Sequence, residues 1–565
     1  MGEKAIEAPL VALVLGPRGA YVAGPGLDES WPADVVTARF VAAAREHRPR
    51  WVVWSAALGL SPIITAGITV PRTWDLAEVH RIVHGGWRGS PGYVWAAVRD
   101  LPEPDVPSPQ RPRLAGFEGD LFDAAHNEDG QPFTAAGQLR PDALTSWATS
   151  PERLRRLALL ALECQAHQAA SLQRLETVDV ARARRTAWSE SAAAVLCLEL
   201  ERDGLPVDRL AAEDLISAAA GPRPVDEAAA DRTRRARDRA VLAHAPGHER
   251  TDLRNPAQVR GLLAVVGVDV PNTRARVLEP YRQSHPLVDA LLTWRKDERI
   301  ATTYGYRWLD EHVGADDRLR GEWTACDGAA GRMTAQHGLH NLPAQLRPAV
   351  CARAGHVFVR TDLGQVEPRV LAVVSGDPAL AEATRSDDLY APVARRLGSD
   401  RPTAKVAVLA AMYGQRSGAA GAALAQLERA YPVAMGLLDR AYADGVAGRS
   451  LRTYGGRLIR LDAGASGMES ARGRYARNAI IQGSAAELFK AWAATVRVAV
   501  AQLGGQIVLC LHDELLVHVP ESRATEAAAL IEGALQSAAR VWAGADRVRF
   551  VADTSIVRRW SDAKD

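Results

Sequence analysis

The chain has 565 residues, an apolar fraction of 47% and a formal net charge of +2. This length is too great for one ordinary domain, so two or more domains are expected. A nearly neutral charge excludes a uniformly basic nucleic-acid-binding protein, so any such surface would have to be a local patch. The five cysteines are odd in number and no pair has metal-ligand spacing, which indicates reduced thiols.

The N-terminal segment MGEKAIEAPLVALVLG is apolar over too few residues to span a membrane, and it lacks a convincing signal-peptide cleavage site. We therefore expect a cytoplasmic protein without a membrane partner. Lysine is rare among the 69 basic side chains, in keeping with a GC-rich genome. The five lysines are Lys4, Lys296, Lys405, Lys490 and Lys564.

The first hundred residues alternate between strand-like and helix-like patterns. Residues 8–24 predict a strand, a turn and a second strand, and residues 31–100 then predict an α/β layer. The stretch 101–115 is rich in proline and predicts a loop or linker.

Helical patterns dominate the middle of the chain. Residues 151–245 are dense in Ala, Leu, Arg and Glu, and a second helical stretch covers 255–312. A domain boundary is predicted near residue 180, before a long helix that ends at Gly204. Mixed strand and helix patterns continue to the C-terminus.

An aspartate follows the buried-strand pattern HVFVRT. Asp362 stands where the apolar run breaks, and the next backbone carbonyl, of Leu363, could add an oxygen ligand for Mg²⁺. The following segment predicts a helix that carries Glu367 and Arg369. In isolation, an aspartate at a strand end is more often a turn or helix cap.

A second aspartate lies between the strand patterns QIVLCL and ELLVHV. His512 and Asp513 would form the tip of an antiparallel hairpin, although a solvated turn would look the same. Two such acids brought together repel each other, and divalent metal ions remove that repulsion. The pair therefore predicts a two-metal site for phosphoryl transfer.

The segment RPTAKVAVLAAMYGQ predicts a helix with Pro402 in its first turn and Gly414 at its end. Four side chains spaced four residues apart share one face: Arg401, Lys405, Leu409 and Tyr413. The two cations could hold a triphosphate, the lysine could protonate a departing pyrophosphate, and the tyrosine could lie against a base. A solvated basic stripe is the alternative interpretation.

Two further segments carry weaker signals. Arg474, Asn478 and Gln482 lie four apart on a predicted helix, and this row could follow a minor groove without reading sequence. Arg332 and Asn341 lie in the glycine-rich segment GAAGRMTAQHGLHNLPAQLR, which is suited to a nucleic-acid backbone.

In this order, the five elements resemble the polymerase region of family A DNA polymerases, the bacterial DNA polymerase I group. The resemblance covers residues 185–565 and implies an α/β (α+β) fold with the palm, fingers and thumb of a right hand. The implied polymerase domain is 181–565, with its parts at about these positions: thumb 185–315, palm 316–398 and 465–565, fingers 399–464.

The resemblance also implies a role for each candidate residue. Asp362, Asp513 and the Leu363 carbonyl would bind two Mg²⁺ or Mn²⁺ ions, with Glu514 in support. The residues expected at the incoming dNTP are Arg401, Lys405, Leu409, Tyr413, Glu367 and Gln365, with Glu367 excluding ribonucleotides. The residues expected at primer and template are Arg332, Asn341, Arg474, Asn478, Gln482 and His512.

The chain departs from the family pattern at five of the quoted positions. Leu409 replaces a usual aromatic residue, Leu363 and Gly364 replace Tyr and Ser, and Gly338 and His340 stand where Asn and Gln are common. Leu409 bears on sugar discrimination and nucleotide affinity rather than on the chemistry, and the loss of the tyrosine hydroxyl at Leu363 would loosen Glu367.

Residues 1–180 resemble the RNase H-like 3′–5′ exonuclease domain of the same family. That chemistry needs a strand with Asp-x-Glu and two further aspartates, whereas the helix segment ALLALECQAHQAA offers only Glu163. We therefore expect an inactive exonuclease-like domain, no proofreading and no 5′-nuclease domain.

The leading hypothesis is a monomeric, template-directed DNA polymerase that binds primer–template DNA and dNTPs. A single-subunit RNA polymerase shares the same logic, but a carboxylate at position 367 would repel a 2′-hydroxyl. A non-catalytic DNA-binding relative is a second alternative. Retention of both aspartates with Arg401 and Lys405 argues against it.

Overall fold

The structure is a computed structural model, and it describes residues 8–104, 130–175, 178–414, 420–461, 467–544 and 547–563. The chain forms two compact units: unit 1 with residues 1–202, 322–334 and 359–556, and unit 2 with residues 203–321, 335–358 and 557–565. The predicted linker lies outside the described residues from position 105 onward. The division into functional domains at residue 180 stays a prediction.

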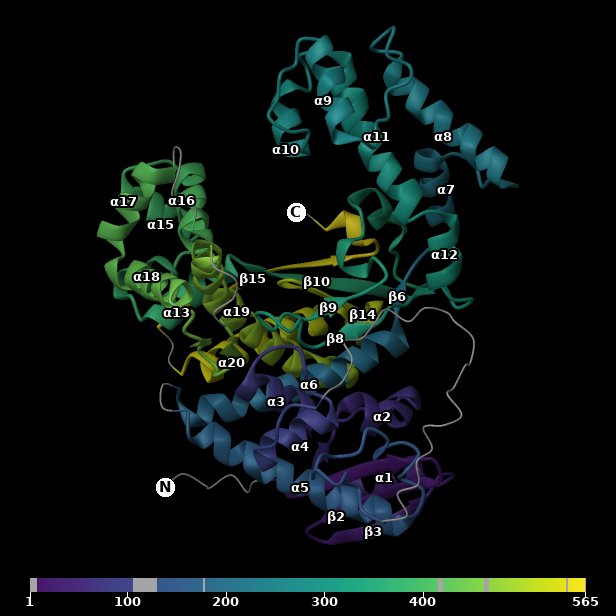
Figure 1. Cartoon of the computed structure of the whole chain (residues 1–565), viewed down its shortest axis with the longest axis vertical. Helices are drawn as coiled ribbons and strands as arrows, with labels where there is room; N and C mark the ends of the chain where they lie inside the picture. The colour runs from purple at the N-terminus through teal and green to yellow at the C-terminus, as the bar shows by residue number, and fades with distance from the viewer. Residues whose placement is uncertain are drawn as a thin grey trace. The chain divides into compact units, whose positions relative to one another are not determined.

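A five-stranded sheet with the order β3-β2-β1-β4-β5 forms the N-terminal layer of unit 1 (Figure 1). Its strands are β1 (Leu10–Gly16), β2 (Gly19–Gly24), β3 (Leu27–Pro32), β4 (Arg50–Val53) and β5 (Thr73–Asp75). β1 pairs antiparallel with β2 and parallel with β4, which confirms the predicted strand, turn and strand over 8–24.

Helices cover both faces of this sheet because successive side chains of a strand point to opposite sides. Val11 and Leu13 pack on one face against α1 (Val36–Glu46) and α2 (Ala56–Thr65). The other face of β1 packs against α3 (Leu76–His84), α4 (Pro91–Arg99) and α5 (Pro151–Gln173). The predicted α/β layer is therefore confirmed. The long helix α6 (Val180–Asp203) begins at the predicted boundary and contributes to both cores.

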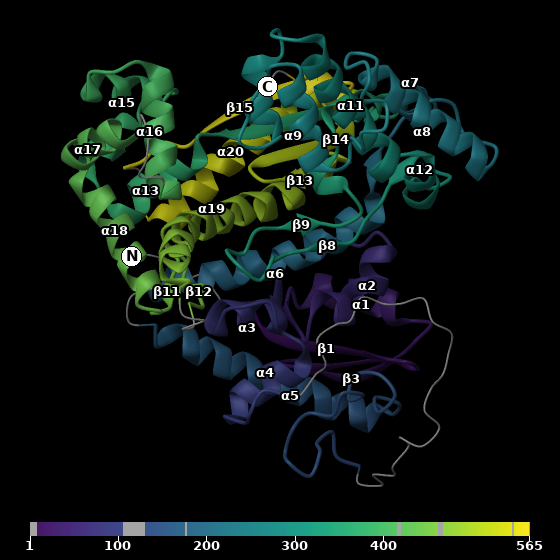
Figure 2. The same ribbon diagram turned by 45° about the horizontal axis from the view of Figure 1, so that its top comes forward.

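A second sheet of unit 1 has the strand order β13-β14-β10-β15. Its strands are β10 (His356–Gly364), β13 (Gln506–Leu511), β14 (Glu514–Pro520) and β15 (Val551–Val557). Two long helices, α19 (Glu469–Ala501) and α20 (Ala524–Ala543), pack against each other and against this sheet (Figure 2). The one-turn helix η4 (Glu521–Arg523) precedes α20.

A group of shorter helices lies between β10 and α19 in the sequence. They are α13 (Val366–Ser375), α14 (Pro378–Ala383), α15 (Tyr390–Leu397), α16 (Arg401–Tyr413), α17 (Ala420–Ala430) and α18 (Pro432–Val446). Asp400 caps α16 by accepting the Thr403 N–H at 2.8 Å, and left-handed Gly414 ends it, as predicted. Two small hairpins complete this region: β11 (Leu451–Arg452) with β12 (Leu458–Ile459), and β8 (Trp323–Thr324) with β9 (Thr334–Ala335).

The helical patterns predicted over 151–245 and 255–312 are confirmed by α5 and α6 of unit 1 and by the helices of unit 2. Unit 2 is mainly helical. Its helices are α7 (Arg209–Ala220), α8 (Glu227–Leu242), α9 (Pro256–Val265), α10 (Ala275–Leu278), α11 (Pro286–Thr303) and α12 (Tyr306–His312). The short elements are β6 (Leu205–Pro206), β7 (Arg318–Leu319), η1 (Glu279–Tyr281), η2 (Leu339–Asn341), η3 (Ala344–Ala349) and η5 (Trp560–Asp562).

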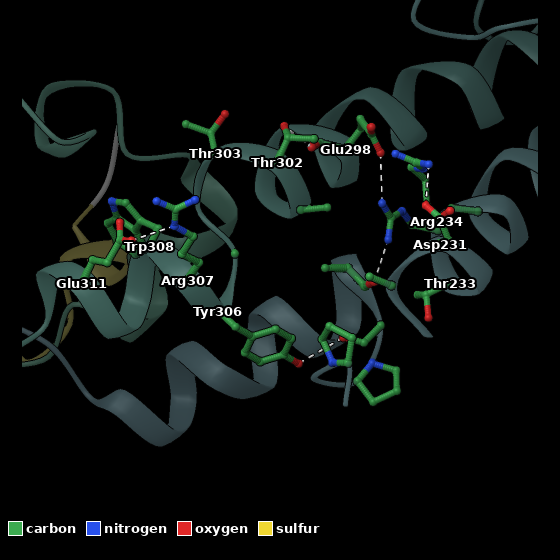
Figure 3. Close-up of a pocket in the computed structure, with 18 of the residues that line it drawn as sticks. Asp231, Thr233, Arg234, Glu298, Thr302, Thr303, Tyr306, Arg307, Trp308 and Glu311 are labelled. Carbon is green, nitrogen blue, oxygen red and sulfur yellow. Dashed lines mark hydrogen bonds and ion pairs between the residues drawn. The ribbon is translucent and has the colours of Figure 1, made fainter. Parts of the chain in front are cut away.

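Unit 2 contains a cavity of about 550 Å³, lined in part by α8, α11 and α12 (Figure 3). None of the residues predicted to act in catalysis or DNA binding lines it. Within the described ranges of the whole chain, no helix is long and apolar enough to cross a membrane.

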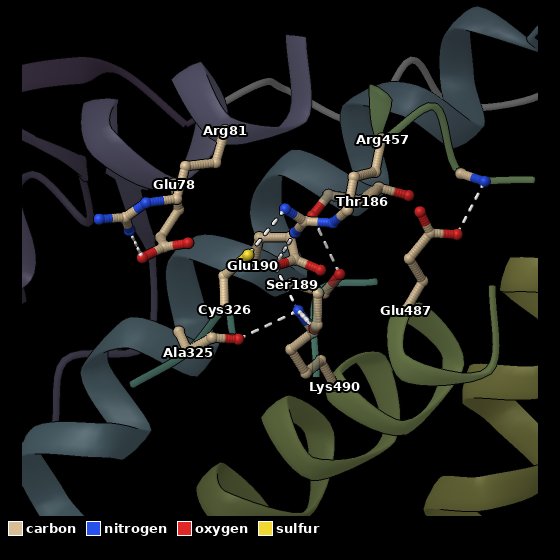
Figure 4. Close-up of polar contacts among 12 residues, drawn as sticks. Glu78, Arg81, Thr186, Ser189, Glu190, Ala325, Cys326, Arg457, Glu487 and Lys490 are labelled. Atoms are coloured by element: carbon tan, nitrogen blue, oxygen red, sulfur yellow. Dashed lines mark hydrogen bonds and ion pairs between the residues drawn. The ribbon is translucent and has the colours of Figure 1, made fainter. Parts of the chain in front are cut away.

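A buried ion-pair network joins α6 to α19 inside unit 1 (Figure 4). The Glu190 carboxylate lies 2.5 Å from both Lys490 Nζ and an Arg457 guanidinium nitrogen, and all three side chains are almost completely buried. Lys490 also donates to the carbonyl oxygens of Gly331 at 2.6 Å and Ala325 at 3.3 Å. Buried charges need such partners. The network therefore links α6 to α19 and has a structural role.

Candidate active site

The structure brings together the two aspartates that the sequence singled out. Asp362 lies on β10, and Asp513 lies in the two-residue turn of the β13–β14 hairpin, where Leu511 pairs with Glu514. The Leu363 N–H donates to the backbone carbonyl of Asp513 at 3.0 Å. The hairpin prediction is confirmed, and β10 continues two residues past its predicted end.

The electrostatics of this pair are unfavourable without a cation. Burial, followed by the negative charge of Asp513, raises the pKa of Asp362 to about 7. The pKa of Asp513 is also raised, chiefly by burial. Arg360 lies 3.4 Å from the Asp362 carboxylate, but it lies closer to Glu514, at 2.9 Å. One guanidinium therefore serves several carboxylates, and negative charge remains in excess.

These donors suit a hard divalent ion that keeps much of its own water. Among the residues described, no group of three or more His, Cys, Asp and Glu side chains could hold a metal ion. An ion at Asp362 and Asp513 would take its other ligands from a backbone carbonyl, water or a bound phosphate. Mg²⁺ accepts such a set, because it prefers oxygen ligands and dehydrates reluctantly.

A cavity of about 270 Å³ adjoins the aspartates within unit 1. It gathers predicted residues from five separate segments of the chain. These are Arg332, Leu363, Gln365, Glu367, Lys405, Leu409, Tyr413, Gln482, His512 and Asp513. Asp362, Arg401, Arg474, Asn478 and Glu514 are not among the lining residues, and Asn341 belongs to unit 2.

Glu367 organises one wall of this cavity. Its carboxylate accepts from an Arg332 guanidinium nitrogen at 2.9 Å and from the Tyr413 hydroxyl at 3.4 Å. Burial raises the pKa of Glu367, and the charge of Arg332 opposes that rise. Three residues predicted from separate motifs thus form one hydrogen-bonded set.

Arg401 is held beside the cavity by a carboxylate that the sequence did not reveal. Its Nε lies 2.6 Å from Asp388 Oδ2, and the side chain is more than half exposed. Gln365 in turn accepts the Leu389 N–H at 2.8 Å and donates to Asp388 at 3.4 Å. Gln365, predicted to bind the nucleotide, here positions Asp388. An anion arriving at Arg401 would have to compete with that ion pair.

The row predicted on α19 is present, with different exposure along it. Arg474 is exposed and donates to Ser470 Oγ at 2.8 Å, whereas Asn478 is partly buried and Gln482 reaches the cavity. Arg477, which no sequence signal separated from Arg474, is buried and forms an ion pair with Asp439 at 2.6 Å. It also donates to the Ala411 carbonyl, so it holds α16 onto α19.

Two of the departures from the family pattern have a steric reason. A Cβ at Gly364 would lie 2.8 Å from Val551 Cγ2 on β15. Gly338 has a φ of +84°, and a Cβ there would lie 2.5 Å from the Tyr304 ring. Bulkier residues at either position would therefore clash with their neighbours.

Two lining or neighbouring residues escaped the sequence analysis. Arg360 lies two residues before Asp362 on the same strand, so strand alternation could have placed both on one face. Tyr390 lines the cavity, and burial, followed by the charge of Glu367, raises its pKa to about 12. Its segment carried no pattern that distinguishes a site from an ordinary helix.

Comparison with protein families decides the ancestry of this chain. The sequence model of DNA polymerase family A matches residues 247–562, which is more than half of the 565 residues. The chain belongs to DNA polymerase family A. This family match contains all five predicted motifs and begins within the segment expected to form the thumb.

Among relatives within DNA polymerase family A, the DNA polymerase I of Chloroflexus aurantiacus is 30% identical over 298 residues, covering 47% of this chain and 32% of the relative. The thermostable DNA polymerase I of Thermus thermophilus is 28% identical, covering 47% and 36%. The chain thus spans about a third of the length of these curated relatives.

A solved structure of the polymerase domain of Pol1 from M. smegmatis, in complex with a DNA primer–template and a dNTP, has a similar fold. The TM-score is 0.67 at 21% identity, and the match covers 98% of this chain and 95% of that one. The mixed α/β architecture predicted from the sequence is therefore confirmed, including the layer that precedes the polymerase motifs.

Proposed function

We propose that this chain is a template-directed DNA polymerase that adds dNTPs to the 3′ end of a primer. One observation carries the proposal: a single cavity beside Asp362 gathers Asp513, Lys405, Tyr413 and Glu367 from segments far apart in the sequence. Membership of DNA polymerase family A supports it, and so does the fold shared with a polymerase that was solved with primer–template DNA and a dNTP.

Asp362, Asp513 and the Leu363 carbonyl would hold two Mg²⁺ ions, which supply charge neutralisation to the attacking oxygen and the leaving phosphate. The donor set fits this role, since burial and then the charge of Asp513 raise the pKa of Asp362, and a bound cation would oppose both effects. Arg360 and Glu514 form an ion pair at 2.9 Å, which would hold both side chains in place beside the aspartates.

The exposed face of α16 would receive the triphosphate. Lys405 lines the cavity and would hold the phosphates, then donate a proton to the departing pyrophosphate. Arg401 would exchange its contact with Asp388 for a phosphate oxygen. Asp400 caps the start of α16, so both cations project from one capped helix.

Glu367 and Tyr413 would select the sugar and the nascent base pair. The Glu367 carboxylate, held by Arg332 and Tyr413, would crowd and repel a 2′-hydroxyl. Leu409 lines the same wall and would replace aromatic stacking with simple apolar contact. The residues proposed to contact primer and template are Arg332, Asn341, Arg474, Asn478, Gln482 and His512.

We further propose that the N-terminal layer lacks proofreading activity. β1 carries no acidic residue, and Glu163 on α5 forms an ion pair with Arg99 at 3.1 Å. None of the described strands of this layer carries the Asp-x-Glu sequence that this chemistry requires.

One assay tests both proposals. A 5′-labelled primer–template is incubated with the protein and Mg²⁺, with dNTPs and then without them. Extension with dNTPs and an intact primer without them are the expected results. No extension would refute the polymerase, and primer shortening would refute the loss of proofreading. Replacing dNTPs with rNTPs for wild type and Glu367→Ala tests sugar selection, because the variant should gain ribonucleotide incorporation.

A further inference from the structure

A second cavity of about 380 Å³ lies in unit 1 and shares no lining residue with the candidate active site. Four parts of the chain enclose it: the start of β4 with residues 71–73, α6, α19 and α20. The polar and aromatic lining residues used below are Arg50, Arg72, Thr73, Arg182, Arg185, Trp188 and Trp542.

The charged side chains that line this cavity are all cationic. Four arginines line it, and no aspartate or glutamate does. The larger cavity of unit 2 provides the contrast (Figure 3). There, Arg234, Arg237 and Arg307 pair with carboxylates that line the same cavity, at 2.5, 3.0 and 2.7 Å. Carboxylates in its own walls neutralise the unit 2 cavity, whereas the unit 1 cavity has no carboxylate among its lining residues.

Several donors in these walls lack an acceptor. Arg182 Nε, Arg185 Nε and Thr73 Oγ1 are buried without a hydrogen-bond partner, and Thr73 is only 2% exposed. The nearest carboxylate to Arg185 is that of Asp179, at 3.9 Å. Buried donors without partners are costly, and an anion beside the same guanidinium groups would compensate their charge.

An aromatic surface borders the same cations. The Arg50 guanidinium lies 4.3 Å from the centroid of the Trp188 ring, and Trp188 itself is partly exposed. Trp542 lines the cavity from α20 and lies 4.9 Å from the Tyr454 ring. Flat rings beside arginines bind planar ligands by stacking and by cation–π contact.

We propose that this cavity binds a small phosphorylated ligand with a planar ring, which is the chemistry of a nucleotide. The phosphate lies against Arg182 and Arg185, and the ring lies against Trp188. The volume is within the range of small-ligand sites and accommodates one such unit. The same chemistry has two sources, a free nucleotide or the end of a single strand of nucleic acid.

Isothermal titration of the full chain tests the proposal, with EDTA present to suppress metal-dependent binding at the active site. The probes are AMP, inorganic phosphate and a 5′-phosphorylated tetranucleotide. We expect one AMP site, and a Kd that rises at least tenfold in Arg182→Ala/Arg185→Ala. Arg156→Ala, an exposed arginine of α5 outside the lining, should change it less than twofold. Trp188→Leu should weaken AMP binding and leave phosphate binding unchanged.

Arg182→Lys/Arg185→Lys replaces the alanine pair if the latter unfolds, and it should retain phosphate binding. AMP binding that is equal in wild type and the alanine variant would overturn the proposal, as would the absence of binding of both AMP and phosphate at millimolar concentration. Equal affinity for AMP and phosphate would overturn the assignment to a nucleotide. Tighter binding of the tetranucleotide through the same arginines would identify a strand end as the source.

Discussion

Two clusters of charged side chains in unit 1 are built on opposite principles. In the network of Glu190, Arg457 and Lys490, all three side chains are inaccessible, and both cations lie 2.5 Å from the one carboxylate. In the site around Asp362 and Asp513, part of the surface is open, and carboxylates outnumber the cation that serves them. The first cluster is closed to any ligand, whereas the second is open to one.

The difference teaches that a perturbed pKa alone does not mark a functional residue. Burial raises the pKa of Glu487 and of Asp75 to about 7, as it does for Asp362. Glu487 and Asp75, however, accept backbone N–H groups, from Gly455 at 2.8 Å and Ala56 at 2.6 Å. Asp75 even lines a cavity of about 710 Å³, so neither a raised pKa nor a neighbouring cavity identifies a functional site by itself. Asp362 and Asp513 differ in that residues from several predicted motifs share the cavity beside them.

Asp513→Asn should cause the greatest loss of activity. Primer extension should fall by about 10³-fold or more, since several kcal/mol of transition-state stabilisation depend on the metal site. The unfolding temperature measured without divalent ions should not fall, because the change removes a repelling charge. Single-turnover extension and thermal unfolding measure the two effects. Activity within tenfold of wild type would place the chemistry elsewhere.

Lys490→Met tests the buried cluster of Glu190, Arg457 and Lys490. Removing one partner leaves Glu190 buried with less compensation, so the free energy of unfolding should fall by about 3–5 kcal/mol. Denaturant unfolding measures this change. An unaltered unfolding curve would show that the network does not stabilise the contact between α6 and α19.

Lys405→Met is the matched change in the candidate active site. It is again a lysine-to-methionine substitution, but on an exposed face of α16. Stability should stay within about 0.5 kcal/mol of wild type. The rate of nucleotide addition should fall on the order of 10²-fold, as for loss of a general acid. A variant that lost stability but retained its rate would reverse the roles of the two lysines.

The smallest effect concerns pH. Because the pKa of Asp362 is about 7 when folded and about 4 when unfolded, the folded state binds more protons between these values. Without divalent ions, stability should therefore fall as pH rises from about 4 to 7, and Asp362→Asn should recover about 1–2 kcal/mol above pH 7. Unfolding curves at pH 5 and pH 8 measure the difference. Mg²⁺ should stabilise only the wild type.

Sequence patterns predicted those elements whose signals are local. The limits of α16 follow from Asp400, Pro402 and Gly414, which are cap, first-turn and terminating residues. The hairpin carrying Asp513 follows from two apolar runs separated by a polar pair. Such features depend on neighbours within a few residues, so a single sequence contains them.

Contacts between residues far apart in the sequence cannot be predicted from such local patterns. No sequence pattern indicates that β10 lies beside β14, and the bond between Leu363 and Asp513 needs the folded sheet. Nothing in the sequence around Asp388 indicated that it would hold Arg401. Lys490 and Lys405 both lie on helices, and only burial against Glu190 distinguishes the structural lysine from the exposed one.

The scarcity of lysine gives this protein a convenient chemical property. Of the lysines in the described ranges, Lys490 is sealed from solvent, while Lys405 and Lys296 are exposed in different units. An amine-acylating reagent would therefore modify α16 against a very sparse background. Mass spectrometry of the acylated peptides would then report occupancy of that helix in the unmodified sequence, without an engineered label.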